Sequence, residues 1–212
     1  MSRTTRSPQA TAALPRLAVQ AVRLALSRYA VDSAHAHCVA AHAATLFAHV
    51  LTHPATSTAF GAAAPQLRER LLLAALLHDI GQAVAERRHH RHSQYLIEHA
   101  DAFETWPRQL RADVGALALA HRKPARARWL NERFHGRREL FQLAAMVRVA
   151  DGLDRAHRSQ AVPVWQVDPS GVLVGVIAGI TEKDLQHLRE RKADAWALAF
   201  PYPLRLMSSD AR

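Results

Sequence analysis

Residues 71–81 read LLLAALLHDIG, an apolar run that ends in a histidine, an aspartate and a glycine. Helical spacing places His78 on the same face as Leu71, so we expect this imidazole to point into the core. Gly81 is expected to end the helix in the left-handed conformation. A buried imidazole or carboxylate without a partner costs on the order of several kcal/mol. The run therefore predicts that His78 and Asp79 are paired or bind a metal ion.

Two further segments carry a polar residue of the same kind on an apolar helical face. His35 lies on one stripe with Val39 and Leu46, and Asp151 follows the apolar stretch 143–150. Two histidines and two carboxylates from three helices form a donor set that suits a buried divalent metal ion. We expect the three segments to converge on one such site. This mixed set does not choose among manganese, magnesium, iron, cobalt, nickel and zinc.

Composition indicates a mostly α protein. The chain has 212 residues, of which 49% are hydrophobic and 8 are glycine, enough for one helical domain with a small appendage. We expect a disordered tail at 1–12, a helical metal-binding domain at 13–160 and an α+β appendage at 161–212. The only cysteine, Cys38, excludes an intramolecular disulfide and fits a cytoplasmic protein. No apolar run approaches the ~18–20 residues of a membrane span, so we expect no membrane association.

The net charge of +10 favours an anionic partner. Nucleic acid, a nucleotide and polyphosphate all satisfy this requirement. Basic residues follow each candidate ligand segment, as Arg87, Arg88 and Arg91, as Arg122, Lys123, Arg126 and Arg128, and as Arg148, Arg155 and Arg158. For any single arginine, a solvated surface position is the simpler interpretation. Three clusters, each beside a candidate metal ligand, favour an anion-binding site.

Helical periodicity, prolines and capping residues predict the order of the elements. Helices are expected at 14–30, 33–52, 65–80, 92–102, 108–121 and 137–158. His90 would then lie in the loop before the fourth of them. The β-branched runs 162–167 and 172–177 flank Asp168-Pro169-Ser170-Gly171, which predicts a hairpin. A capping-box pattern at Thr181 predicts a helix to about Phe200, and 203–207 supplies a third short strand.

The ordered motifs resemble a known family. They are Arg28-Tyr29-Ala30-Val31-Asp32 with His35, Leu77-His78-Asp79-Ile80-Gly81, His90-Arg91-His92-Ser93-Gln94-Tyr95, His121-Arg122-Lys123, Val149-Ala150-Asp151-Gly152-Leu153-Asp154-Arg155 and Glu190-Arg191-Lys192-Ala193-Asp194. From about residue 14 onwards the chain resembles the HD-domain metal-dependent phosphohydrolases. Within them it is most similar to the C-terminal domain of the exopolyphosphatase/guanosine pentaphosphatase (Ppx/GppA) proteins. The resemblance implies a helical bundle with the small C-terminal hairpin and helix.

The resemblance also implies roles for individual residues. It makes His35, His78, Asp79 and Asp151 ligands of a first metal, with His78 and Asp79 as the catalytic pair. Some members bind a second metal through further histidines, and His92 and His121 occupy the matching positions. A supporting or phosphate-contacting role for these two stays open. Arg91, Arg122, Lys123 and Arg155 would bind the substrate. The remaining histidines, at 37, 42, 49, 53, 89, 99, 135, 157 and 187, are interpreted as surface or packing residues.

The implied reaction is hydrolysis of a phosphoester or phosphoanhydride, in which a divalent ion polarises the phosphoryl oxygen and activates a water molecule. The actin-like domain of Ppx/GppA enzymes has no counterpart in these 212 residues, so its activity is not carried over. One alternative is a non-catalytic module that binds polyphosphate or a nucleotide beside a separate actin-like Ppx/GppA protein. Another is a nucleic-acid-binding protein, although no known reading motif is present and only 6% of the residues are aromatic. Related modules often dimerise, so a homodimer is a further expectation.

Overall fold

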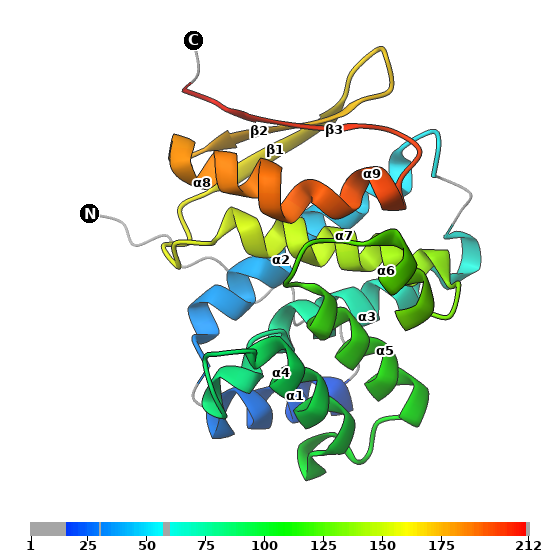
Figure 1. Ribbon diagram of the computed structural model, residues 1–212, viewed down its shortest axis with the longest axis vertical. Coiled ribbons are helices and arrows are strands. Elements are labelled where there is room, and N and C mark those ends of the chain that lie inside the picture. The colour runs from blue at the N-terminus through cyan, green and yellow to red at the C-terminus, as the bar shows by residue number, and fades with distance from the viewer. Residues whose placement is uncertain (1–15, 30, 57–59, 211–212) are drawn as a thin grey trace.

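The computed structural model describes residues 16–29, 31–56 and 60–210 (Figure 1). Within them the chain is mostly helical, with a three-stranded sheet near the C-terminus, as the sequence predicts. The tail expected at 1–12 lies outside the described residues. Among the described helices, none is long and apolar enough to cross a membrane.

A bundle of helices forms the first part of the fold. Its α-helices are α1 (Arg16–Arg28), α2 (Ser33–Thr52), α3 (Ala64–Leu77), α4 (His89–His99), α5 (Arg108–Ala120), α6 (Ala127–Arg133) and α7 (Arg138–Leu153). Short 3₁₀ turns lie at Gly61–Ala63, Ile80–Ala83 (η3) and Asp101–Phe103. The Asp32 side chain caps α2 by accepting a hydrogen bond from the His35 backbone amide. Helix α3 is central, and every residue from Leu71 to Leu77 is fully buried.

The second part of the fold packs on α7 and α2 (Figure 1). Strands β1 (Val162–Val167) and β2 (Leu173–Ala178) form an antiparallel hairpin, and β3 (Leu204–Ser208) runs parallel to β2. Helices α8 (Glu182–His187) and α9 (Trp196–Ala199) lie between this sheet and α7. Trp165 and Leu206 of the sheet belong to the same buried cluster as Leu46 and Leu143 of the bundle. One hydrophobic core therefore connects the hairpin with the helices.

Several boundaries differ from those predicted. Helix α4 begins at His89 rather than at 92, because Arg88 takes a left-handed conformation (φ 63°) that turns the chain into the helix early. His90 is therefore a buried helical residue and not part of a loop. Helix α7 ends at Leu153 rather than at 158, and α6 is an additional short helix. The helix predicted at 181–200 is interrupted after α8 by a π turn at Leu188–Lys192 and a 3₁₀ turn at Ala193–Ala195.

Gly81 does not end α3 in the left-handed conformation, so this expectation was wrong. The glycine lies within η3, and the positive-φ glycines of the described chain are others. A Cβ atom at Gly81 would lie 2.2 Å from the carbonyl oxygen of His89 and 2.3 Å from the amide nitrogen of Ser93. The absence of a side chain lets α4 pack directly on η3. This contact brings His89 to the end of α3, beside Asp79.

Candidate metal centre

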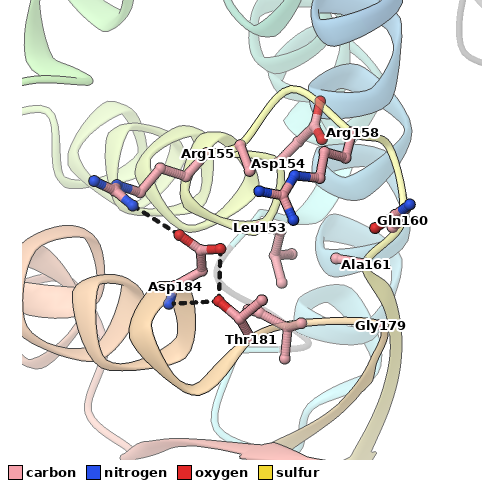
Figure 2. Close-up of a pocket in the computed structure, with 11 residues that line it drawn as sticks. Leu153, Asp154, Arg155, Arg158, Gln160, Ala161, Gly179, Thr181 and Asp184 are labelled. Atoms are coloured by element: carbon pink, nitrogen blue, oxygen red, sulfur yellow. Dashed lines mark hydrogen bonds and ion pairs between the residues drawn. The ribbon is translucent and has the colours of Figure 1, made fainter.

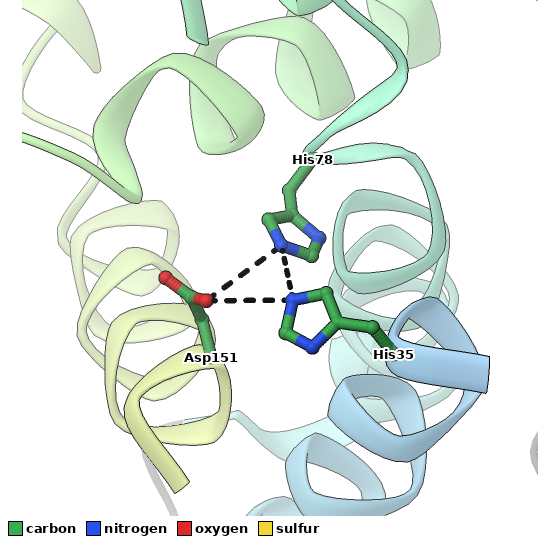
Figure 3. Close-up of side chains that lie close together, drawn as sticks. All are labelled: His35, His78 and Asp151. Atoms are coloured by element: carbon green, nitrogen blue, oxygen red, sulfur yellow. Dashed lines mark hydrogen bonds and ion pairs between the residues drawn. The ribbon is translucent and has the colours of Figure 1, made fainter. Parts of the chain in front are cut away.

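Three elements bring His35, His78 and Asp151 together (Figure 3). His35 lies in the first turns of α2, His78 follows the last residue of α3, and Asp151 lies near the end of α7. Nε2 of His35 is 3.3 Å from Nε2 of His78, and the two nitrogens are 3.6 and 3.8 Å from Asp151 Oδ1. Two ligands that are each ~2.1 Å from one ion lie about 3–3.5 Å apart. The spacing of this triad suits a shared cation.

A second group shares His78 and adds Asp79 and His121. His121 follows α5, and its Nε2 lies 3.5 Å from Asp79 Oδ1. His89, the first residue of α4, completes this side, with its Nε2 3.0 Å from the same oxygen and 3.2 Å from His121 Nε2. All of these side chains are at least nine-tenths buried. The two groups form one continuous cluster, called the histidine–aspartate cluster below: His35, His78, Asp79, His89, His121 and Asp151.

Hydrogen bonds to Nδ1 set the orientation of three imidazoles. Nδ1 of His78 bonds the Ala75 carbonyl at 2.8 Å, and Nδ1 of His121 bonds the Ala118 carbonyl at 2.6 Å. Nδ1 of His35 bonds the Asp154 carboxylate at 2.9 Å. Carbonyl and carboxylate oxygens only accept hydrogen bonds, so Nδ1 carries the proton in each ring. When such a ring is neutral, its Nε2 carries a lone pair that points into the cluster. The Nε2 atoms of His35 and His78 are 3.3 Å apart, so their two lone pairs require a cation or an extra proton between them.

Asp79 has one oxygen that the protein leaves unsatisfied. Its Oδ2 accepts a hydrogen bond from Gln82 at 2.6 Å, whereas its buried Oδ1 has no hydrogen-bond donor within the described chain. The nearby His89 Nε2 is within ion-pair distance but is not aligned for a hydrogen bond. A buried carboxylate oxygen without a donor is costly. The orphaned oxygen and the inward lone pairs are the donor set that a divalent metal ion needs, so the residues fit such an ion.

The electrostatics of the cluster follow from burial and close charges. Burial holds the pKa of His121 well below its usual value, which keeps this imidazole neutral. Burial also opposes protonation of His35, but the nearby Asp151 carboxylate and the hydrogen bond to Asp154 outweigh it and raise its pKa to about 10. The pKa of Asp79 is lowered, since the surrounding imidazoles outweigh the effect of burial. Without a metal ion, the extra proton of the cluster therefore resides on His35.

A lysine also reaches the cluster. Lys192 Nζ donates hydrogen bonds to Asp151 Oδ2 and, at 3.2 Å, to the His121 carbonyl. This lysine ends the π turn after α8, and π turns are frequent at functional sites. A Cβ at Gly152 would lie 2.9 Å from Lys192 Cγ and 2.6 Å from Leu188 Cδ1, so a side chain at this position would force both neighbouring side chains to shift. Asp151 thus binds Lys192 through one oxygen and presents the other to the histidines.

The structure brings together most of the predicted ligands, but not all. His35, His78, Asp79, Asp151 and His121 converge as expected. His92 is half-buried and has no hydrogen bond or ring contact with the described residues of the cluster. His89, interpreted from the sequence as a surface or packing residue, takes its place because α4 begins earlier than predicted. The sequence spacing between Asp79 and His89 does not predict this position of His89. The position depends on the packing of α4 against Gly81, which is a tertiary contact.

The predicted substrate-binding residues fall into two groups. Arg91, Arg122 and Lys123 line a cavity beside the cluster. Arg155 is directed elsewhere, because its Nη1 donates a 2.7 Å hydrogen bond to Asp184 of α8 (Figure 2). Arg148, counted among the basic residues near the ligands, is fully buried and bonds Asp194 and two backbone carbonyls. It has a structural role and is not available to a ligand.

These features define a helical protein with a buried histidine–aspartate cluster. Residues 19–204 match the family model described as Ppx/GppA phosphatase, domain III. The chain therefore belongs to the Ppx/GppA phosphatase family, through that domain. No curated protein matches the chain at a significant level.

Proposed function

We propose that the chain is an HD-type metal-dependent phosphohydrolase that acts on a phosphorylated anionic substrate, such as a nucleotide, an alarmone or polyphosphate. The observation that carries this proposal is the orphaned Oδ1 of Asp79, facing inward imidazole nitrogens in a fully buried cluster. Membership of a phosphatase family and a basic cavity beside the cluster support it.

His35, His78, Asp79 and Asp151 would hold a first ion, as the resemblance to HD domains implies. His121 and His89 lie on the Oδ1 side of Asp79 and would extend the donor set to a second ion. When bound, a divalent ion supplies Lewis acidity at a phosphoryl oxygen and lowers the pKa of a coordinated water molecule. His92 is not proposed as a ligand.

The remaining residues of the site orient the ligands and hold the substrate. Asp154 fixes His35 through its Nδ1 proton, and Lys192 holds Asp151 Oδ2 so that Oδ1 faces the histidines. Arg122 and Lys123 would offset negative charge on the phosphoryl oxygens. Asp79 would orient the attacking water through the same carboxylate that contacts the ion.

Metal content is the first test. Untagged protein, required because the chain has 14 histidines, is analysed by elemental mass spectrometry after incubation with manganese or magnesium. We expect about one or two ions per chain. The Asp79→Ala and His121→Ala variants should lose metal, while His92→Ala, a histidine of the same helix as His89, should keep it. Full metal content in Asp79→Ala would contradict the site assignment.

Turnover is tested by phosphate release from nucleotides, guanosine alarmones and polyphosphate. We expect release that depends on added metal and disappears in Asp79→Ala. Arg122→Ala should raise KM for an anionic substrate with a smaller effect on kcat. Release that continues at the wild-type rate in Asp79→Ala would place the reaction elsewhere.

Lys192 favours a second candidate function. Its ammonium group already neutralises Asp151, and His35 with a pKa of about 10 adds another positive charge, so most of the negative charge is balanced without a metal ion. The chain would then be a non-catalytic module that binds polyphosphate or a nucleotide, working with a separate actin-like Ppx/GppA protein. Tight anion binding that persists in chelator, with no bound metal and no phosphate release, would establish this alternative.

A further inference from the structure

The segment 154–161, which joins α7 to β1 (Figure 2), has a strained backbone. His157 and Ser159 both take the left-handed conformation, with φ of 53° and 50°. Residues other than glycine rarely adopt this conformation, and its cost in free energy must be offset by surrounding contacts. Two such residues within three positions indicate that specific contacts hold the segment in place.

Asp154 provides several of these contacts. Its Oδ1 accepts a hydrogen bond from the Ser159 amide at 2.7 Å, and its carbonyl oxygen accepts one from the His157 amide at 2.9 Å. Its Oδ2 accepts the bond from Nδ1 of His35 described above. The same residue therefore fixes the strained segment and one edge of the His35 ring, so the segment is positioned relative to the histidine–aspartate cluster.

The ring of His157 lies flat against the ring of His35. The two centroids are 3.9 Å apart and the planes differ by 11°. His35 is buried, whereas 41% of the His157 side chain is exposed, so His157 covers one face of His35 from the solvent side. The last side-chain torsion of histidine has broad minima, which lets an imidazole turn easily unless its neighbours restrain it. Stacking by His157 supplies such a restraint.

Asp32 connects His157 to the start of α2. Its Oδ2 accepts a hydrogen bond from Nδ1 of His157 at 2.9 Å, and its Oδ1 accepts one from the His35 backbone amide at 3.0 Å. Asp32 is thus both the N-cap of α2 and the anchor of the ring that covers His35. The backbone, the ring edge and the ring face of His35 are each held by a different residue.

We propose that His157, anchored by Asp32, is a positioning residue that holds the His35 ring so that its Nε2 faces His78 and Asp151 (Figure 3). The consequence for metal binding rests on the proposed function. The restraint on the ring is a property of the metal-free protein. Neither His157 nor Asp32 is a proposed metal ligand, so removing the His157 ring loosens the site without removing a donor atom.

The restraint is measured first, in chelator, on untagged ¹⁵N-labelled protein. Proton–nitrogen correlation spectra detect the Nδ1 proton of His35, which is assigned by its absence in His35→Ala. His157→Asn removes the ring and keeps a residue that tolerates the left-handed conformation. We expect exchange of this proton with water to become at least about tenfold faster, because the ring opens more often. His157→Phe restores a flat ring and should retain most of the slow exchange.

Metal affinity is the second readout, measured for zinc and manganese by competition with a fluorescent chelator. We expect His157→Asn to weaken binding by about tenfold, at the lower end of the effects known for residues that orient a ligand. His157→Phe should stay within about threefold of the wild-type protein. The His157–Asp32 pair is largely solvent-exposed, so the urea midpoint of the metal-free protein should change little. A purely structural histidine would instead lower this midpoint and leave metal affinity unchanged.

His135→Asn is the matched control. His135 also has a left-handed backbone, with φ of 51°, and it lies in the turn after α6, outside the histidine–aspartate cluster. The same substitution there should change neither the exchange of the His35 proton nor metal affinity. An equal change in both variants would overturn the proposal, as would wild-type exchange in His157→Asn.

Failure of this proposal is distinguishable from failure of the proposed function. If the wild-type protein binds no metal, the phosphohydrolase proposal fails, and the exchange measurement still decides whether His157 restrains His35. If metal binds and is lost in Asp79→Ala, but His157→Asn binds it as tightly as the wild-type protein, the metal site stands and the positioning role of His157 fails.

Discussion

Two buried carboxylates of this protein have opposite surroundings. Asp113, on α5, accepts hydrogen bonds from Arg70, Arg137 and Gln109, so that each of its oxygens has two donors. Asp79 is nearly as buried, yet one of its oxygens has no donor within the described chain. A fully satisfied carboxylate contributes to the fold, whereas an unsatisfied one costs free energy that the rest of the protein must offset. Asp113 is therefore fully used by the fold, whereas Asp79 keeps one oxygen open towards the histidines.

The largest expected effect on stability comes from removing the Asp113 carboxylate, whose hydrogen bonds are all satisfied. Asp113→Ala leaves Arg70 and Arg137 without their shared partner where α3, α5 and the start of α7 meet. We expect the free energy of unfolding to fall by about 2–4 kcal/mol, reduced from the fully buried case because both arginines are partly exposed. Urea unfolding followed by circular dichroism measures it. The exposed Asp101→Ala is the control and should change stability by less than ~0.5 kcal/mol.

Gly81→Ala tests whether the packing of α4 on η3 is needed for the histidine–aspartate cluster, without replacing any residue of the cluster. The added Cβ would collide with the backbone of α4, so we expect a loss of about 2–3 kcal/mol in unfolding free energy. Because His89 moves with α4, metal content should fall as well. A variant of normal stability and full metal content would show that the close contact between η3 and α4 is not required.

The pH dependence of stability tests whether the Asp113 carboxylate stabilises the fold. Burial raises the pKa of Asp113, but hydrogen bonds from Arg137, Arg70 and Gln109 outweigh it and lower the pKa below its usual value. A lowered native pKa gives stability that is present above the unfolded pKa of about 4 and is lost as pH falls through the native pKa. Relative to Asp113→Asn, the wild-type protein should therefore lose more stability as the pH falls below about 4. Parallel unfolding curves over that range would contradict this assignment.

The smallest effect on stability is expected at Asp79. In chelator, Asp79→Asn should change the unfolding free energy by less than about 1 kcal/mol or increase it, because the amide can donate to a neighbouring imidazole lone pair. The same variant should lose metal binding. A loss of stability comparable to that of Asp113→Ala would mean that Asp79 is structural, and the contrast between the two carboxylates would disappear.

Much of the fold followed from local patterns. Helix α2 has the predicted bounds, and the hairpin forms at Asp168-Pro169-Ser170-Gly171 with Gly171 at φ 81°. These elements depend on caps, turns and periodicity within a few residues. The break of the C-terminal helix into α8, a π turn and α9 was not predictable in this way. It places Lys192 against Asp151, and nothing in the segment 181–200 alone encodes that contact.

Apolar periodicity and turn residues were enough to predict the helical class, the hairpin and the convergence of His35, His78, Asp79 and Asp151. The position of His121 beside them was expected only from the resemblance to HD domains. Contacts between distant segments place His89 rather than His92 in the cluster, pair Lys192 with Asp151 and turn Arg155 towards Asp184. The physical reason is distance along the chain. The register of α4 against η3 depends on a close backbone contact at Gly81. The turn of the C-terminal helix that reaches α7 depends on the close approach of the Leu188 and Lys192 side chains to Gly152. Such contacts form between segments that have no local pattern in common.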